Sequence, residues 1–133
     1  MKFSVPKETK LKENRVALTP DVVKGLVKKG FEIMVEAGAG INSFYADDSY
    51  TAAGASIVDK NKCYSDADVV LKVNAPQSDE ISLMKKEAIL ISFMFADHDD
   101  MFAIYQSEDS RSIRFNSEAL EKGSDHFRIT NVI

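Results

Sequence analysis

The sequence has a single cysteine, no tryptophan and only two histidines in 133 residues. Because Cys63 has no partner, no internal disulfide can form and no multi-cysteine metal cluster can be built. The most apolar stretch, residues 88–96, falls short of the roughly 20 residues that span a bilayer, and the first eight residues contain no apolar signal region. These absences predict a cytoplasmic chain without direct membrane insertion.

The sequence also lacks an excess of basic residues. It contains 17 Lys and Arg against 21 Asp and Glu, which gives a formal net charge of −4 and a pI near 5.2. A broad basic surface that could neutralise phosphates is therefore not expected, and nucleic-acid binding has no electrostatic basis. Hydrophobic residues make up 44% of the chain, which suits one compact domain of ordinary size.

Hydrophobic periodicity and turn signals predict alternating strands and helices. The predicted strands are 2–6, 31–36, 55–59, 69–73 and 89–95, and the predicted helices are 20–29, one that begins near Asp47, 60–65 and 79–85. We expect the last strand, a continuous apolar run, to be covered on both faces. The alternation favours an α/β fold with a doubly wound, mainly parallel, Rossmann-like sheet, which is incomplete in this chain.

The first helix has clear boundary signals. Thr19 is a suitable N-cap, Pro20 suits the first helical position and Gly30 suits the residue beyond the end. Its predicted buried stripe consists of Val22, Val23, Leu26 and Val27. For the second helix, Asp47 or Asp48 is the expected cap.

Two cationic residues stand near the carboxyl ends of predicted strands. Ligands of open α/β sheets bind beyond the carboxyl ends of the strands, where Arg15 follows the first strand and Lys72 lies near the end of the fourth. Together they could hold a carboxylate, with Arg as a planar fork and Lys as a point charge. The alternative is that Arg15 is a solvated loop charge and that Lys72 extends from a strand end. We predict Arg15 and Lys72 as substrate-binding residues.

Residues 38–43 form a Gly-rich loop between a strand and a helix, and Asp59 ends the next strand 21 residues after Gly38. This pattern approaches the dinucleotide-binding fingerprint, but Ser43 stands where the third glycine belongs. Because the helix starts several residues too late to meet a pyrophosphate, we favour a simple Gly-rich turn.

The remaining reactive residue types give no catalytic or metal site. His98 lies in a run of acidic residues, where a surface position is favoured over a proton relay, and the neighbouring Asp residues lack the spacing of metal ligands. Cys63 is expected to be a packing residue. We therefore predict no catalytic residue and no metal ligand.

Three stretches together resemble one family. They are residues 5–8 with 13–20 (VPKE and ENRVALTP), residues 35–40 (VEAGAG), and residues 71–76 with 79–81 (LKVNAP and DEI). They resemble the amino-terminal domain that alanine dehydrogenases share with the alpha subunits of proton-translocating NAD(P) transhydrogenases. The resemblance covers about residues 1–100, which we take as one domain, and residues 101–133 form a tail that does not match.

The resemblance implies an oxidoreductase. In alanine dehydrogenases a catalytic histidine stands where this sequence has Phe95, so the transhydrogenase branch is favoured, in which hydride passes between NAD(H) and NADP(H) coupled to proton translocation. In complete relatives, an NADP(H)-binding part and a membrane part are partners, the enzyme is a homo-oligomer, and this domain is peripheral to the cytoplasmic membrane. Arg15 and Lys72 match positions that hold the substrate carboxylate in alanine dehydrogenases.

The tail suggests a truncated or frameshifted product, since the family continues with a further strand, a nicotinamide-facing loop and a second domain. The chain alone is therefore expected to be inactive and to bind no cofactor. Residues 101–105 are expected to pack back as a cover, with residues 106–112 solvated. Two alternatives remain: an alanine dehydrogenase fragment, and a non-catalytic module that binds a small anion or a partner.

Overall fold

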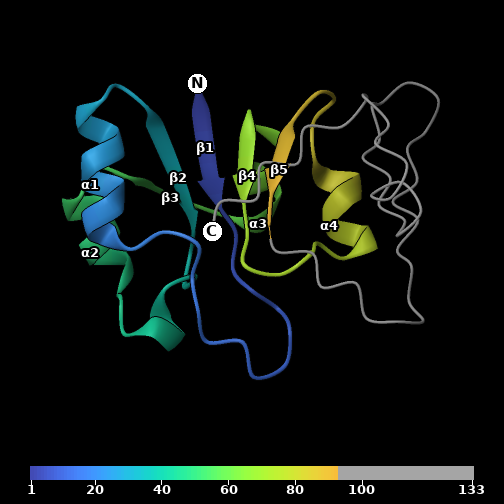
Figure 1. Ribbon diagram of the computed structural model, residues 1–133, viewed down its shortest axis with the longest axis horizontal. Coiled ribbons are helices and arrows are strands. Elements are labelled where there is room, and N and C mark those ends of the chain that lie inside the picture. Colours follow the sequence, from blue (N-terminus) through green and yellow to red (C-terminus); the bar gives the residue numbers. More distant parts are fainter. Residues whose placement is uncertain (93–133) are drawn as a thin grey trace, which may run out of the picture.

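A computed structural model describes residues 1–92 as one α/β unit (Figure 1). Strands and helices alternate along it, as predicted. The strands are β1 (Lys2–Val5), β2 (Glu32–Glu36), β3 (Ser56–Val58), β4 (Val69–Leu71) and β5 (Ile89–Ile91). The helices are α1 (Pro20–Lys28), α2 (Asp47–Ala52), α3 (Lys60–Ser65) and α4 (Ser78–Leu83), with a short 3-10 turn, η1 (Ile41–Ser43).

The five strands form one parallel sheet in the order β3-β2-β1-β4-β5. The predicted doubly wound parallel fold is therefore confirmed. The chain builds outward from β1 to β3 and then returns to the other side of β1 to form β4. The strand order thus reverses between β1 and β4, and the loops that follow these two strands lie beside each other at the carboxyl edge of the sheet.

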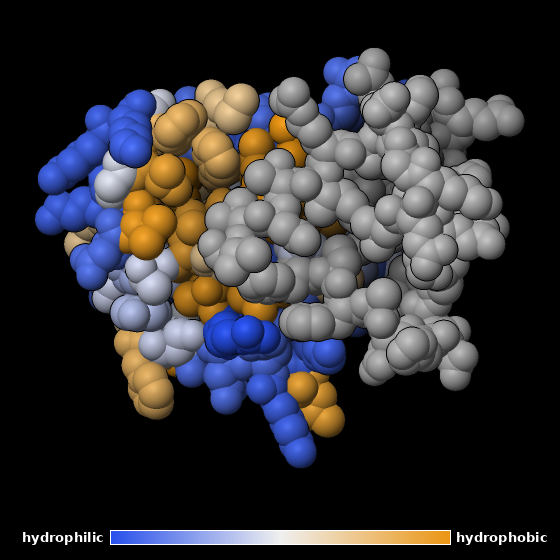
Figure 2. Space-filling view, viewed as in Figure 1, coloured by the Kyte–Doolittle hydropathy of each residue, from blue (hydrophilic) through white to orange (hydrophobic). Residues whose placement is uncertain are grey.

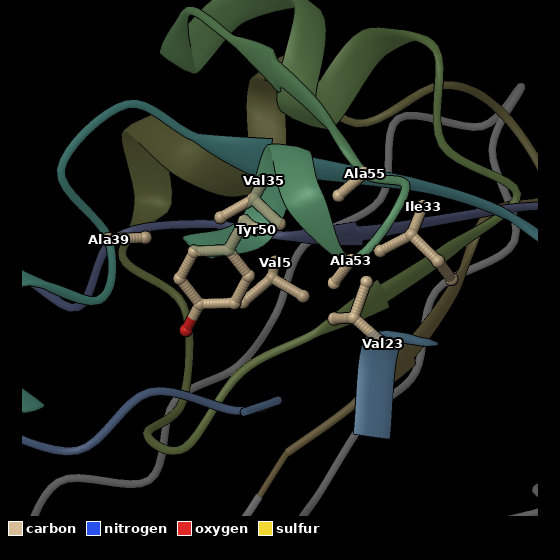
Figure 3. Packing of buried hydrophobic residues seen from close by; sticks show 8 residues of the cluster. All are labelled: Val5, Val23, Ile33, Val35, Ala39, Tyr50, Ala53 and Ala55. Atoms are coloured by element: carbon tan, nitrogen blue, oxygen red, sulfur yellow. The ribbon is translucent and has the colours of Figure 1, made fainter. Parts of the chain in front are cut away.

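One face of the sheet is covered by α1 and α2. Alternate residues of β1 and β2, among them Val5 and Val35, point toward this face and are completely buried. Figure 3 shows the Tyr50 ring from α2 lying against them, with Val23 from α1 directed toward the same cluster. The Tyr50 hydroxyl donates to the Leu18 carbonyl oxygen at 2.9 Å, so the ring also secures the segment that leads into α1.

The opposite face is covered by α3 and α4. Met34 from β2 and Val70 from β4 pack there against the buried Tyr64 ring of α3. Leu83 of α4 packs against the same cluster. Because successive strand residues point to opposite faces, the neighbours Met34 and Val35 belong to different clusters. This second layer is what positions α4 close to the loop after β4.

Helix α1 begins at Pro20 and ends before Gly30, as predicted. Gly30 has φ of +89°, the left-handed conformation that terminates helices at low cost in glycine. Thr19 is the N-cap residue, as predicted, and has the extended conformation of that position, although its side chain makes no capping hydrogen bond. One detail was wrong: Val22 is 49% exposed, whereas Val23 is completely buried. The buried stripe is therefore narrower than the run of valines suggested.

Further predictions need correction at element ends. Ala46 occupies the N-cap position of α2, so neither Asp47 nor Asp48 is the cap. The last strand was expected to be covered on both faces, yet Ile89 is 52% exposed, because β5 lies at one edge of the described sheet.

Within residues 1–92 no helix has the length and apolarity needed to cross a membrane. Phe95, His98 and residues 101–133, with the predicted cover and solvated segment, lie outside the described residues.

Candidate functional site

Polar side chains gather where the strand order reverses. The loop after β1 carries Glu8, Glu13 and Arg15, and the loop after β4 carries Lys72 and Asn74. Figure 2 shows a largely hydrophilic rim in the lower part of the view, below the sheet. Since crevices at such a reversal are the usual ligand sites of open α/β sheets, this edge is the candidate functional site.

Lys72 lies inside the fold and is surrounded by acidic groups. Its ammonium nitrogen is 3.6 Å from Oε2 of Glu8 and 3.5 Å from Oε2 of Glu80. The three side chains are only 1%, 4% and 1% exposed, in the order Lys72, Glu8 and Glu80. A charge removed from water in this way is stable only with opposite charges beside it. Lys72 is therefore an internal cation with two carboxylate partners.

Glu80 reaches Lys72 from the first turn of α4. Its Oε2 also accepts a hydrogen bond from the backbone N–H of Gln77, the N-cap residue, at 2.9 Å. This contact satisfies one of the free N–H groups at the helix start. Two effects raise the pKa of Tyr64: burial of its hydroxyl, and the nearby negative charge of Glu80. Glu80 thus links the start of α4 to Lys72 in the loop after β4.

Glu8 holds the loop after β4 in place. Its carboxylate accepts hydrogen bonds from the Val73 N–H at 2.6 Å and from the Asn74 N–H at 3.3 Å. It also accepts from the Asn74 side-chain amide at 3.3 Å. These bonds explain why β4 ends at Leu71 rather than at Val73 as predicted, because the backbone turns toward Glu8 instead of continuing beside its neighbour strand.

Glu13 binds Arg15 through two parallel hydrogen bonds. Nε of Arg15 donates to Oε1 and Nη2 donates to Oε2, both at 2.9 Å, and the Arg15 backbone N–H also donates to Oε1 at 2.9 Å. Oε2 further accepts from the Asn74 side-chain amide at 2.7 Å. These donors, Arg15 first, lower the pKa of Glu13 to about 2. The Glu13 side chain is 8% exposed and that of Arg15 is 61% exposed.

The predicted pair, Arg15 and Lys72, thus occupies one edge of the sheet within a continuous polar network. The links run from Lys72 to Glu8, from Glu8 to Asn74, and from Asn74 through Glu13 to Arg15. Sequence reasoning missed Glu8, Glu13, Asn74 and Glu80 as members. All four stand in the motifs that carry the family resemblance, but only the tertiary structure brings these motifs together.

The network has an excess of negative charge. Two cations, Lys72 and Arg15, face three carboxylates, Glu8, Glu13 and Glu80, so the formal charges sum to −1 when all are ionised. Lys72 contacts two of the acids and Arg15 is held by the third. The edge therefore already contains the carboxylates that satisfy its two cations.

The Gly-rich loop has the structure of a turn. The Gly38 N–H donates to the Asp47 carboxylate at 2.9 Å, and Gly38 has φ of +76°. A Cβ on Gly40 would lie 2.6 Å from the Tyr50 ring, so glycine is required there by close packing. Asp59 caps α3 by accepting from the Lys62 N–H at 2.9 Å. These contacts support the interpretation as a turn and do not form a cradle for a pyrophosphate.

Other reactive groups in residues 1–92 serve packing. Cys63 is completely buried, and burial raises the pKa of its thiol to about 12, which suits a packing residue and not a nucleophile. The described part of the chain contains no group of three or more His, Cys, Asp or Glu side chains arranged to hold a metal ion.

Comparisons with known proteins agree with this fold. Residues 4–129 match the family described as "Alanine dehydrogenase/PNT, N-terminal domain". This match extends past residue 100, where we placed the domain boundary, whereas the pairwise matches cover 71–72% of the chain. An alanine dehydrogenase of Staphylococcus epidermidis is 44% identical over 94 residues. An NAD(P) transhydrogenase alpha subunit chain of Rhodospirillum rubrum is 45% identical over 102 residues.

Solved structures give the same result. An L-alanine dehydrogenase has a TM-score of 0.68 at 38% identity over 71% of this chain and 26% of the other. A transhydrogenase from Sinorhizobium meliloti has a TM-score of 0.67 at 38% identity over 69% of this chain and 26% of the other. The chain spans about a quarter of the length of its curated relatives, 25% and 27% for the two named above. It belongs to the alanine dehydrogenase/PNT N-terminal domain family of oxidoreductases.

Proposed function

We propose that this chain serves as the amino-terminal segment of an NAD(P) transhydrogenase alpha subunit, whose complete form transfers hydride between NAD(H) and NADP(H). The observation that carries the proposal is the state of the two cations at the carboxyl edge. Lys72 is enclosed by Glu8 and Glu80, and Arg15 is held by Glu13. A direct transfer between two nicotinamides needs no cationic pair for a substrate acid, so this arrangement suits it.

The sequence around residue 95 supports the same branch. Phe95 stands where alanine dehydrogenases carry a catalytic histidine, so the chain offers no imidazole for acid-base chemistry at that position. Hydride transfer between cofactors depends chiefly on their positioning, since the nicotinamides themselves carry the chemistry.

The contacts of the Gly-rich turn, residues 38–43, do not suit the phosphates of a dinucleotide. The Gly38 N–H is engaged by Asp47, and the Tyr50 ring crowds Gly40. In this proposal the polar network shapes one wall of the cofactor cleft, and other parts of the complete enzyme hold the cofactors. Those parts include an NADP(H)-binding partner and a proton-translocating membrane portion, with the domain peripheral to the cytoplasmic membrane in a homo-oligomer.

The second candidate is an alanine dehydrogenase segment. It is favoured by the position of Arg15 and Lys72 in one network at the point where the strand order reverses, where they would bind a substrate carboxylate. This function would require Glu13 to release Arg15, or Glu8 and Glu80 to release Lys72. A non-catalytic module that binds a small anion or a partner would carry the same requirement.

Two chimeras distinguish the first two candidates. Residues 1–96 of this chain replace the matching segment in the Rhodospirillum rubrum transhydrogenase subunit and, separately, in the Staphylococcus epidermidis alanine dehydrogenase. We expect hydride transfer from NADH to an NADP analogue in the first chimera and no NAD-dependent oxidation of alanine in the second. Each parent segment reinserted by the same cloning route is the control. Alanine oxidation by the second chimera, with an inactive first chimera, would reverse the assignment.

A further inference from the structure

Two loops at the carboxyl edge of the sheet present apolar side chains to solvent. Leu11, in the loop after β1, is 87% exposed, and Ile41 and Phe44, at the two ends of the turn η1, are 60% and 97% exposed. Figure 1 shows both loops below the sheet, and Figure 2 shows apolar groups projecting among hydrophilic ones along this lower rim. We call the surface formed by Leu11, Ile41 and Phe44 the apolar rim.

The two loops that carry the apolar rim are joined. The Ser43 hydroxyl in η1 donates to the Asn14 carbonyl oxygen in the loop after β1. The Glu13 N–H donates to the Lys10 carbonyl oxygen at 3.0 Å, so Leu11 lies at the tip of a hydrogen-bonded turn. Single exposed apolar residues are ordinary in proteins, but apolar side chains gathered on adjoining loops mark an interaction surface.

Phe44 is held outward by a rigid and strained turn. Its φ is +64°, in the left-handed region that favours glycine, and its N–H donates to the Ile41 carbonyl oxygen at 3.0 Å. The next residue, Tyr45, packs inward, with its ring centroid 6.3 Å from that of the buried Tyr50. Backbone strain that serves to expose an aromatic side chain is typical of a residue that makes a functional contact.

The exposed charges of the loop after β1 are all positive. They belong to Lys7, Lys10, Lys12 and Arg15. The two acids of the same loop, Glu8 and Glu13, point inward, with side chains only 4% and 8% exposed. Since the whole chain has a net charge of −4, this corner has the opposite sign to the chain as a whole. A surface that complements the apolar rim therefore combines apolar side chains with carboxylates.

We propose that the apolar rim is the contact surface for the part of the complete subunit that lies beyond this domain, and that the opposing surface is apolar and acidic. This inference rests on the proposed function and deepens it, because it says where the second wall of the cofactor cleft meets this domain. The chain spans about a quarter of the length of its relatives, so most of a complete subunit lies outside it. A crevice at the carboxyl edge needs such a second wall.

Cysteine labelling tests this contact, because the only native cysteine, Cys63, is completely buried. Leu11→Cys and Phe44→Cys are prepared separately in the 133-residue chain and in the transhydrogenase chimera. The rate of iodoacetamide labelling is then followed for each peptide by mass spectrometry. We expect labelling at both positions to be about tenfold slower or more in the chimera, because the reagent reaches a covered thiol only when the contact opens.

The matched control is Lys28→Cys. Lys28 is exposed in the last turn of α1, at the opposite edge of the sheet, so its labelling rate should be the same in the two proteins. About 1 M sodium chloride should weaken the protection of Leu11→Cys, since salt screens the attraction between the flanking lysines and carboxylates. Protection that salt leaves unchanged would contradict the acidic character of the opposing surface.

Equal labelling of Leu11→Cys and Phe44→Cys in the chain and in the chimera would overturn the inference. Protection that grows with the concentration of the short chain would assign the rim to a second copy, and protection by phosphatidylserine vesicles would assign it to a lipid surface; each also overturns it. The hydride-transfer assay is a separate measurement. Protection in an inactive chimera would support this contact and not the proposed function, and an active chimera without protection would do the reverse.

Discussion

The ammonium group of Lys72 lies 3.5 Å from a carboxylate oxygen of Glu80, and each of these side chains is 1% exposed. Glu80 belongs to the first turn of α4 and Lys72 follows β4 directly. The contact therefore fixes the helix to the sheet next to the candidate site. It also gives Lys72 a structural role that does not depend on any ligand.

Replacement of Lys72 should strongly destabilise the chain. Lys72→Met leaves Glu8 and Glu80 buried without their shared cation, so we expect a loss of about 3 to 5 kcal/mol in the free energy of unfolding, measured with urea. Lys60→Met is the control, because the Lys60–Asp79 pair is at the surface, with side chains 37% and 69% exposed. Its cost should stay within about 1 kcal/mol. Similar costs for the two variants would contradict the structural role of the buried cluster.

The contribution of Glu13 to stability should depend on pH. Its pKa is about 2 in the folded chain, below the ordinary value of 4.5, so the stabilisation is fully present above about pH 4.5 and is lost as pH falls through 2. At neutral pH we expect Glu13→Gln to lower the free energy of unfolding by roughly 1 to 2 kcal/mol. This deficit should shrink toward zero in acid, because only the wild type then loses the charge. Urea unfolding of both proteins across this pH range measures it, and a constant deficit would argue against the Arg15 contact.

Glycine positions should respond to alanine in opposite directions. In Gly40→Ala the new Cβ would lie 2.6 Å from the Tyr50 ring and 2.8 Å from the Tyr45 carbonyl oxygen, so a loss of about 1 to 3 kcal/mol is expected. Gly25 lies inside α1, and a Cβ added there would have no neighbouring atom within 4 Å. Gly25→Ala should therefore stabilise the chain by about 0.5 to 1 kcal/mol. Thermal unfolding of the two variants tests the close packing assigned to Gly40.

The Cys63 thiol should be unreactive in the folded chain. It is completely buried and its pKa is raised to about 12 by burial, so little thiolate forms at mildly alkaline pH and no reagent has access. We expect slow labelling by iodoacetamide in buffer and rapid labelling in urea, followed by mass spectrometry. Equal rates in the two conditions would place Cys63 outside the core.

The chain alone should not bind NADH tightly. The Gly38 N–H is engaged by Asp47 and Tyr50 crowds Gly40, so residues 38–43 offer no phosphate cradle. Calorimetric titration should show no dissociation constant below about 100 µM. A saturable signal at lower concentrations would mean that this turn, or a part of the chain beyond residue 92, binds the cofactor.

Local sequence signals determined the elements themselves. Pro20 and Gly30 fix the ends of α1 because their preferred dihedral angles suit a helix start and a helix end. The alternation of apolar runs and turn residues determined the α/β class, because strands and helices bury their residues with different periods. The family resemblance also followed from three motifs read along the chain, without reference to their positions in space.

Only the tertiary structure decided the site. Glu8 and Val73 are 65 positions apart in the sequence, and they meet because β4 pairs with β1 after the strand order reverses. No local pattern encodes that pairing, which depends on burial of both sheet faces at once. The same long-range packing exposes Val22 and buries Val23, and it encloses Lys72 between two acids. The sequence could show which cations stand near strand ends, but their carboxylate partners became apparent only when the loops were brought together.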